Sequence, residues 1–263
     1  MSAKGVRPVQ GQIGKTPYAI EIRHLKKSFD EHEVLKDISI EVAEGETVAV
    51  LGKSGAGKSV LIKCIVALLD PDAGTIVLFG GDIAQVGKKE LLELRKRIGF
   101  LFQGGALYDS MSVRENLEFP LRRQKPRPSL EVTDALVNEA LKNVGLSDAI
   151  NKMPSELSGG MRKRLGLART LIQKPDIMLY DEPTTGLDPI TSREISRLIL
   201  EVQNRYKTSS IIITHDIECA KITSNRIVVL KDGLCVAGGT YEELENSTDE
   251  WVRSFFAWHA GSR

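Results

Sequence analysis

The stretch GKSGAGKS, residues 52–59, decides how this sequence is interpreted. It follows the apolar run VAVL (residues 48–51) and precedes a helical pattern over residues 59–69, which ends before Asp70-Pro71. Phosphate oxygens need several converging N–H donors, and glycines let the backbone approach closely and adopt left-handed dihedrals. The pattern G-x-x-x-x-G-K-[S/T] between a strand and a helix therefore predicts a phosphate-binding loop. The predicted contacts are Gly52, Lys53, Ser54, Gly55, Ala56, Gly57, Lys58 and Ser59.

Two residues of this loop have separate predicted roles. Lys58 is expected to reach the β- and γ-phosphates of a nucleotide, and Ser59 to ligate Mg²⁺. The alternative is a glycine-rich turn without a ligand, and the strand, the helix and the Lys-Ser pair together argue against it. A second GKT, at residues 14–16, lacks all of that context and is not predicted to bind phosphate.

Composition excludes several classes of protein. The 263 residues carry 36 basic and 35 acidic side chains, a net charge of +1, which gives no case for nucleic acid as a partner. Three well-separated cysteines indicate buried thiols in a reducing compartment rather than disulfides or a zinc site. No apolar run approaches the roughly 20 residues of a membrane helix, and no signal peptide is evident. We therefore expect a soluble cytoplasmic chain with a flexible N-terminal tail over residues 1–17.

Strand and helix patterns alternate through the rest of the chain. Three partly alternating segments predict an antiparallel β layer: residues 19–25, 34–42 and 74–79. Short apolar strands at residues 48–51, 98–102, 177–180 and 211–214, with helices at 130–144, 160–173 and 191–206, predict an α/β core with a parallel sheet. Residues 226–237 predict a hairpin at the edge of that core, turning at Lys231-Asp232-Gly233. Residues 103–161 hold no convincing strand and predict a helical insertion. Within it, RRQKPRP (122–128) is predicted to be a surface loop, with a binding patch as the alternative.

Polar side chains follow three of the apolar strands. Asp181 and Glu182 end the run IMLY, and neighbouring side chains at a strand end point to opposite sides. We expect Asp181 to hold Mg²⁺ and Glu182 to polarise the attacking water. Because parallel strands present their carboxyl ends to one crevice, His215 is expected at the γ-phosphate and Gln103 near the metal and the water. A lone histidine is more often structural, which is the alternative for His215.

The motif Leu157-Ser158-Gly159-Gly160 before a helix resembles the signature of ABC-type ATPases. The similarity covers residues 18–245, in the family's motif order, and implies a single P-loop NTPase domain with a RecA-like parallel core, an antiparallel layer and the helical insertion. By position, Phe29 matches the aromatic residue that stacks on adenine, Gln103 the Q-loop glutamine and His215 the switch histidine. Asp181 and Glu182 match the Walker B pair, and Asp188 the D-loop. Met161 departs from the usual glutamine, and Phe29 stands where tyrosine is frequent.

The resemblance also implies partners. It implies a head-to-tail homodimer in which ATP is held between the phosphate loop of one copy and Ser158, Gly159 and Gly160 of the other. The segment FQGGALYDSMSVRENLEFPL resembles the corresponding segment of the MlaF-type ATPases of MCE-protein systems. These systems move phospholipids between bacterial membranes. Permease subunits, an MCE-domain protein and a small regulatory subunit are then expected, at the cytoplasmic side of the inner membrane. The ATPase of an importer for another small solute, or a non-transport ABC ATPase, remains the alternative.

The end of the chain has two alternatives. Residues 246–263, rich in Trp and Phe, resemble that family's C-terminal extension, which packs on the partner ATPase. The alternative is a C-terminal helix that packs on the core of its own chain.

Overall fold

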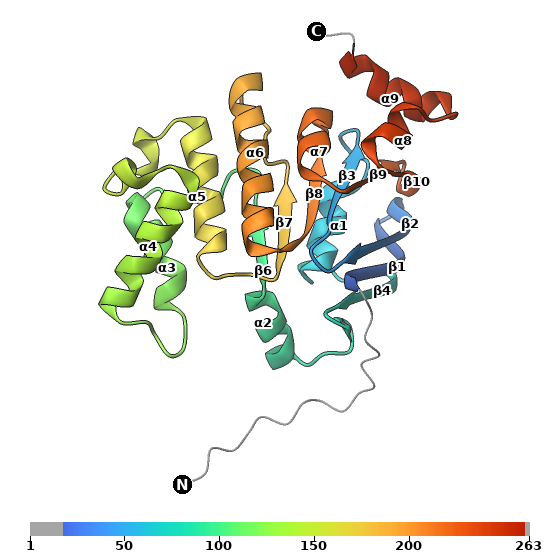
Figure 1. Cartoon of the computed structure of the whole chain (residues 1–263). Coiled ribbons are helices and arrows are strands. Elements are labelled where there is room, and N and C mark those ends of the chain that lie inside the picture. The colour runs from blue at the N-terminus through green and yellow to red at the C-terminus, as the bar shows by residue number, and fades with distance from the viewer. Residues whose placement is uncertain (1–17, 261–263) are drawn as a thin grey trace.

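The centre of the protein is one twisted sheet. The structure, a computed structural model, describes residues 18–260, so the expected tail at 1–17 lies outside the described residues. Ten strands follow the order β5-β4-β1-β2-β10-β9-β3-β8-β7-β6 (Figure 1). Their bounds are β1 Tyr18–Phe29, β2 His32–Ala43, β3 Thr47–Gly52, β4 Ala73–Leu78, β5 Gly81–Asp82, β6 Ile98–Leu101, β7 Ile177–Asp181, β8 Ser209–Thr214, β9 Arg226–Lys231 and β10 Leu234–Gly239.

The predicted parallel core is confirmed. β3 pairs in parallel with β8 and β9, and β7 pairs in parallel with β8 and β6. All residues of β3 and β8 are buried, as a sheet covered on both faces requires. Alternate residues of β7 serve the two faces: Ile177 and Leu179 pack in the core around α1, while Met178 and Tyr180 pack in the core of α5 and α6.

The predicted antiparallel layer is also present, and the predicted hairpin β9–β10 lies at the edge of the parallel core, next to β3. β1 pairs antiparallel with β2 and β4. The hairpin β9–β10 does not end at a free edge, because β10 meets β2 in parallel at Leu234 and Asp37. The sequence could not show this bridge, since it joins strands almost 200 positions apart. The hairpin is the junction that makes one sheet of the two layers.

Helices cover the sheet and form the insertion. They are α1 Lys58–Ile65, α2 Lys88–Lys96, α3 Val113–Arg122, α4 Leu130–Val144, α5 Gly159–Leu171, α6 Pro189–Tyr206, α7 Ile217–Thr223, α8 Tyr241–Glu245 and α9 Glu250–Ala260, with 3₁₀ turns at Ser147–Ala149 and Pro154–Glu156. α3, α4 and α5 lie together at one end of the sheet, far from β1 and β4 (Figure 1). Among the described residues, no helix combines the length and apolar content needed to cross a membrane.

Helix α1 is shorter than predicted. The apolar pattern over residues 59–69 suggests one helix, but α1 ends at Ile65 and Ala67 adopts a left-handed φ of 53°. The amide of Leu68 then donates to the carbonyl of Lys63 at 2.9 Å, which is the bond of a left-handed helix cap. Val66, Ala67 and Leu69 still pack on the core, so the apolar pattern continues past the end of the helix.

Helix α9 packs on the chain's own sheet. Val252 and Phe256 are 1% and 0% exposed and belong to a cluster with Ala49, Leu51 and Val229. Of the two alternatives for the C-terminus, the single chain therefore has the helix that closes its own core.

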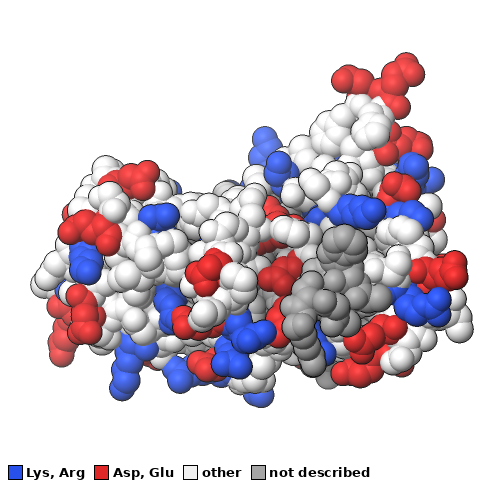
Figure 2. Space-filling model, turned by 90° about the horizontal axis from the view of Figure 1, so that it is seen from above, with Lys and Arg blue, Asp and Glu red and all other residues white. Residues whose placement is uncertain are grey.

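Seen from above, basic and acidic side chains are interspersed over the visible surface of the protein (Figure 2).

Candidate nucleotide site

The loop GKSGAGKS connects β3 to α1, as predicted. Gly55 has a φ of +83°, and a Cβ there would meet no atom within 4 Å, so the loop is open above it. Gly57 has a φ of +98°, and its Cβ would lie 2.7 Å from Cδ2 of Leu35. Gly57 caps α1 without a side-chain hydrogen bond, which leaves the first amides of the helix available to an anion.

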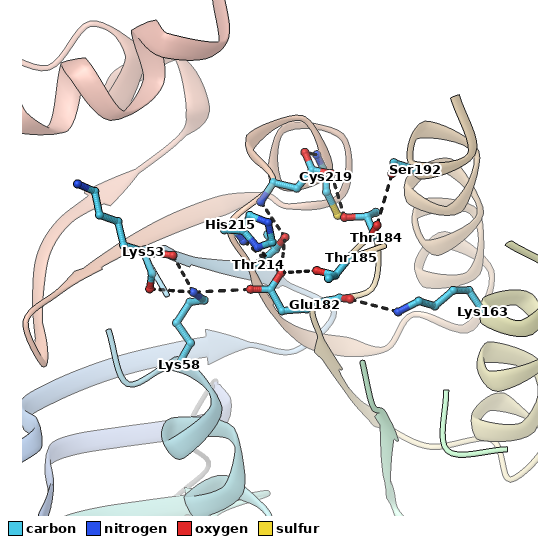
Figure 3. Close-up of polar contacts among 12 residues, drawn as sticks. Lys53, Lys58, Lys163, Glu182, Thr184, Thr185, Ser192, Thr214, His215 and Cys219 are labelled. Atoms are coloured by element: carbon cyan, nitrogen blue, oxygen red, sulfur yellow. Dashed lines mark hydrogen bonds and ion pairs between the residues drawn. The ribbon is translucent and has the colours of Figure 1, made fainter. Parts of the chain in front are cut away.

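Lys58 is held in the loop by its neighbours. Its side chain is 7% exposed, and its Nζ donates to the carbonyls of Gly52 at 2.7 Å and Lys53 at 3.1 Å. The same ammonium lies 3.6 Å from Oε1 of Glu182 (Figure 3). The loop lysine and the acid that follows β7, 124 positions apart, are thus paired.

Glu182 is the centre of the polar network. Its Oε2 accepts from Thr185 Oγ1 at 3.1 Å and lies 2.8 Å from Nδ1 of His215, whose side chain is 60% exposed. Glu182 has a φ of 50°, a left-handed conformation that non-glycine residues adopt at a cost and that often occurs at functional sites. Three of the predicted residues therefore meet: Lys58, Glu182 and His215 (Figure 3).

One cavity of about 870 Å³ contains this network, within the usual size of a ligand pocket. Ten of the predicted residues line it: Gly52, Lys53, Ser54, Gly55, Gly57, Lys58, Ser59, Gln103, Glu182 and His215. Six further lining residues were not predicted to belong to the site: Val34, Val60, Thr185, Trp251, Ser254 and Phe255. A glycine-lined cavity with a buried lysine, a carboxylate and a histidine suits the phosphates of a nucleotide and the activation of water.

Comparison with known proteins gives the family. The sequence profile described as ABC transporter matches residues 35–185. The chain belongs to the ABC transporter ATPase family. The ABC fold expected from the sequence is confirmed, and so is the activity: this is an ATP-hydrolysing subunit of an ABC transporter that binds ATP.

Three curated relatives align over most of the chain. The probable ribonucleotide transport ATP-binding protein mkl of Mycobacterium leprae is 40% identical over 93% of this chain and 71% of its own length. The intermembrane phospholipid transport system ATP-binding protein MlaF of Haemophilus influenzae is 37% identical over 90% of this chain and 89% of its length. The phosphonates import ATP-binding protein PhnC of Alcaligenes faecalis is 41% identical over 86% of this chain and 84% of its own length.

A solved structure has the same fold. The ATP-binding cassette MJ0796, described as dimeric, post-hydrolysis and bound to ADP and Pi, superposes with a TM-score of 0.76 at 31% identity. The match covers 84% of this chain and 98% of that one.

Other predicted contacts of this ABC ATPase lie outside the cavity lining. Ala56 is 8% exposed and packs in the core, and Asp181 ends β7. Phe29, at the end of β1, is 42% exposed, and its ring centroid lies 5.5 Å from Nζ of Lys27. Its role as an adenine platform therefore stays a prediction. Instead, Trp251 and Phe255 of α9, with ring centroids 5.8 Å apart, contribute the aromatic part of the lining.

The signature residues form the start of α5. The hydroxyl of Ser158 caps this helix by accepting from the amide of Met161 at 3.2 Å, and Gly159 approaches Leu187, whose Cδ2 lies 3.3 Å from the position of a Cβ. Met161 itself packs against the core of the helical insertion. Ser158, Gly159 and Gly160 are not among the described residues that line the chain's own cavity, so their contact with ATP stays a prediction.

Asp188 has a clear structural role. It caps α6 by accepting from the amides of Ile190 and Thr191 at 3.0 Å and from Thr191 Oγ1 at 2.6 Å. The hydroxyl bond to Thr191 is the main cause of the lowered pKa of Asp188. Its predicted contact with ATP stays a prediction, and the capping role is the one that the fold itself gives.

Asp181 is the residue that fits a cation. Within residues 18–260, its Oδ1 is buried and has no hydrogen-bond partner, and burial, followed by the nearby charge of Glu182, raises the pKa of Asp181. An unpaired buried carboxylate oxygen is the type of donor that Mg²⁺ prefers, and Ser59 and Gln103 of the cavity lining carry further oxygen donors. Asp181, Ser59 and Gln103 therefore fit the metal that the sequence predicts.

Replacing Asp181 by asparagine should stabilise the metal-free protein. A carboxyl whose pKa is raised on folding stabilises the fold below its ordinary pKa of 3.8 and loses that contribution as the pH rises through the folded pKa. At neutral pH the charge of Asp181 therefore destabilises the fold. We expect Asp181→Asn to raise the melting temperature by about 2–4 °C for each kcal/mol gained, and this gain to disappear as the pH falls towards 4.

The same variant tests the metal. Mg²⁺ with ATP should stabilise the wild type further and Asp181→Asn much less, as thermal unfolding with and without both ligands would show. Asp148→Asn, at an exposed position of the insertion, is the control. A lower melting temperature for metal-free Asp181→Asn, or undiminished stabilisation by Mg²⁺ with ATP, would contradict this assignment.

Proposed function

We propose that this ATPase drives phospholipid transport between membranes, with ATP and Mg²⁺ bound between two head-to-tail copies of the chain. The observation that supports the catalytic part is the meeting of Lys58, Glu182 and His215 in one cavity. The transported substrate is inferred from similarity to the MlaF relative along nearly the whole of both chains.

Each residue of the cavity has a task in this proposal. Lys58 exchanges its contact with Glu182 for contacts with the terminal phosphates. Glu182 is thereby released from its ion pair with the lysine. Glu182 is then free to accept a proton from the attacking water, while His215, which lies beside it, interacts with the γ-phosphate. Ser59, Gln103 and Asp181 hold Mg²⁺, which supplies positive charge to the phosphate oxygens.

The dimer follows from the separation of the motifs. The phosphate loop lies in the cavity, whereas Ser158, Gly159 and Gly160 lie at the start of α5, outside it. Only one set of motifs is present in the sequence, so a second copy must supply the other half of each site. The dimeric cassette MJ0796 supports this arrangement by its similar fold.

The phospholipid substrate has a direct rival. PhnC, a phosphonate import protein, is as similar in identity as the MlaF relative, so the ATPase residues alone do not select the cargo. Our proposal includes permease subunits at the cytoplasmic side of the inner membrane, an MCE-domain protein and a small regulatory subunit. The test is to purify the tagged chain with its partners and reconstitute them in vesicles. ATP-dependent transfer of labelled phospholipid supports the proposal, and uptake of a small solute without lipid transfer contradicts it.

We further propose that a permease helix docks beside β6. Two cavities of about 460 and 200 Å³ share Ile98, Phe100 and Phe102, and Phe102 is 42% exposed. The nearby Leu68 and Tyr108 are 58% and 38% exposed. The smaller cavity is mainly apolar, and Arg169 and Gln173 add polar groups to the larger one. This groove lies directly before Gln103, where a docked helix could influence the nucleotide cavity.

A charge in the groove should prevent docking. We expect Phe102→Glu to weaken binding to the detergent-solubilised permease by about 30-fold or more, the effect of losing a central aromatic contact. Affinity titration measures the change, and the ATPase rate of the isolated chain is compared in parallel. Val236→Glu, on exposed β10, is the matched control. Unchanged permease affinity in Phe102→Glu would exclude this groove as the docking site.

A further inference from the structure

Lys163 is a buried lysine on the signature helix α5 for which the sequence predicted no role. Its side chain is 7% exposed, although it belongs to the basic run Arg162-Lys163-Arg164. Its Nζ donates to the backbone carbonyl of Gln103. It also donates, at 3.3 Å, to the backbone carbonyl of Glu182 (Figure 3). One ammonium group thus joins the signature helix to the two segments that carry the predicted metal ligand and the predicted base.

The charge of Lys163 is costly at this place. Burial lowers the pKa of Lys163, and the nearby carboxylates of Glu182 and Asp181 oppose that shift. An apolar side chain of similar length would fill the same volume without a charge to bury, but it would leave two carbonyls without this donor. The arrangement therefore indicates a function for the donor itself.

Both backbone groups of Glu182 are fixed. Its amide donates to the carbonyl of Ile213 at 2.8 Å, which ties it to β8, and its carbonyl accepts from Lys163 and from the amide of Thr185, both at 3.3 Å. Glu182 has a φ of 50°, and this strained conformation needs support from its surroundings. Lys163, on helix α5, therefore helps to hold the carbonyl of this strained residue.

The same face of α5 is tightly joined to the segment after Gln103. A Cβ on Gly166 would lie 3.1 Å from Cα of Gly105, and Arg169 donates to the carbonyl of Ala106. Lys163, Gly166 and Arg169 are spaced three apart, so they share one side of the helix. A displacement of α5 must therefore move the Gln103 segment with it.

We propose that Lys163 is a positioning residue that couples the position of the signature helix to the backbone of Gln103 and Glu182. The inference rests on the catalytic role proposed for Glu182. When a second copy or the permease moves the insertion, the ammonium carries that movement to both carbonyls and aligns the base and the metal ligand. Lys163 is not among the described residues that line the cavity, and it acts through these two residues.

The test separates catalytic rate from nucleotide binding. Lys163→Met is expected to lower kcat of ATP hydrolysis by about 10–100-fold, the usual range for loss of a group that orients an active residue. Its Kd for ATP should stay within about threefold of the wild type, since no phosphate contact is removed. Lys163→Arg keeps the charge and the donors and should restore most of kcat. Arg164→Met is the matched control, because Arg164 contacts Val144 and Glu194 instead.

The outcomes distinguish this inference from the proposed function. Normal kcat in Lys163→Met, or equal loss in the Met and Arg variants, overturns the inference. Glu182→Gln is measured in parallel: if it hydrolyses ATP normally, the proposed site fails and this inference fails with it. If only Glu182→Gln is slow, the site stands and the role of Lys163 is wrong. Should Lys163→Met not fold, Lys163→Gln is subjected to the same rate and affinity measurements.

Discussion

Glu182→Gln is expected to slow ATP hydrolysis by about 10²–10⁴-fold, the range for loss of a general base. The side-chain amide of the glutamine can still bond to His215 and Thr185, so the local structure should persist. This amide, however, cannot take a proton from water. The change also removes the charge paired with Lys58 at 3.6 Å, which frees the lysine for phosphate. ATP affinity should therefore be unchanged or higher.

Single-turnover hydrolysis and equilibrium ATP binding measure the two effects. Glu201→Gln, an exposed position on α6, controls for the loss of one carboxylate. Hydrolysis within a few-fold of the wild type in Glu182→Gln would show that another group acts as the base.

Lys58→Ala is expected to weaken ATP binding by about 10–100-fold, because a hydrogen bond to a charged group contributes about 1.5–3 kcal/mol. The loop also loses the donor that joins the carbonyls of Gly52 and Lys53, so its shape is less well fixed. Turnover should fall with binding. Titration with ATP measures the affinity, and Lys89→Ala on exposed α2 is the control. Near-normal binding and hydrolysis in Lys58→Ala would contradict the phosphate site.

The catalytic side of the cavity could be predicted from sequence because it is built from local patterns. GKSGAGKS lies between a strand and a helix, and Gln103, Asp181, Glu182 and His215 each follow a short apolar strand. Parallel strands bring such ends together, and Gln103, Glu182 and His215 do line one cavity. The same logic gave the parallel core and the helical insertion.

The features that were missed depend on tertiary contacts or on polar sequence. α2 was not predicted, and none of its residues is buried. Lys163 lies in a basic run typical of a solvated face, and only the meeting of three segments buries it. Trp251 and Phe255 line the cavity because Val252 and Phe256, on the neighbouring side of α9, anchor that helix to the sheet.

The central claim is that ATP joins two copies of this chain, and the mass of Glu182→Gln in solution tests it most directly. Light scattering after gel filtration, with saturating ATP and Mg²⁺, should give twice the 29.0 kDa of one chain, with two ATP molecules per particle. Without nucleotide, or with Ser158→Arg added, the mass should return to that of one chain. A particle of 29.0 kDa that has ATP bound would contradict the account.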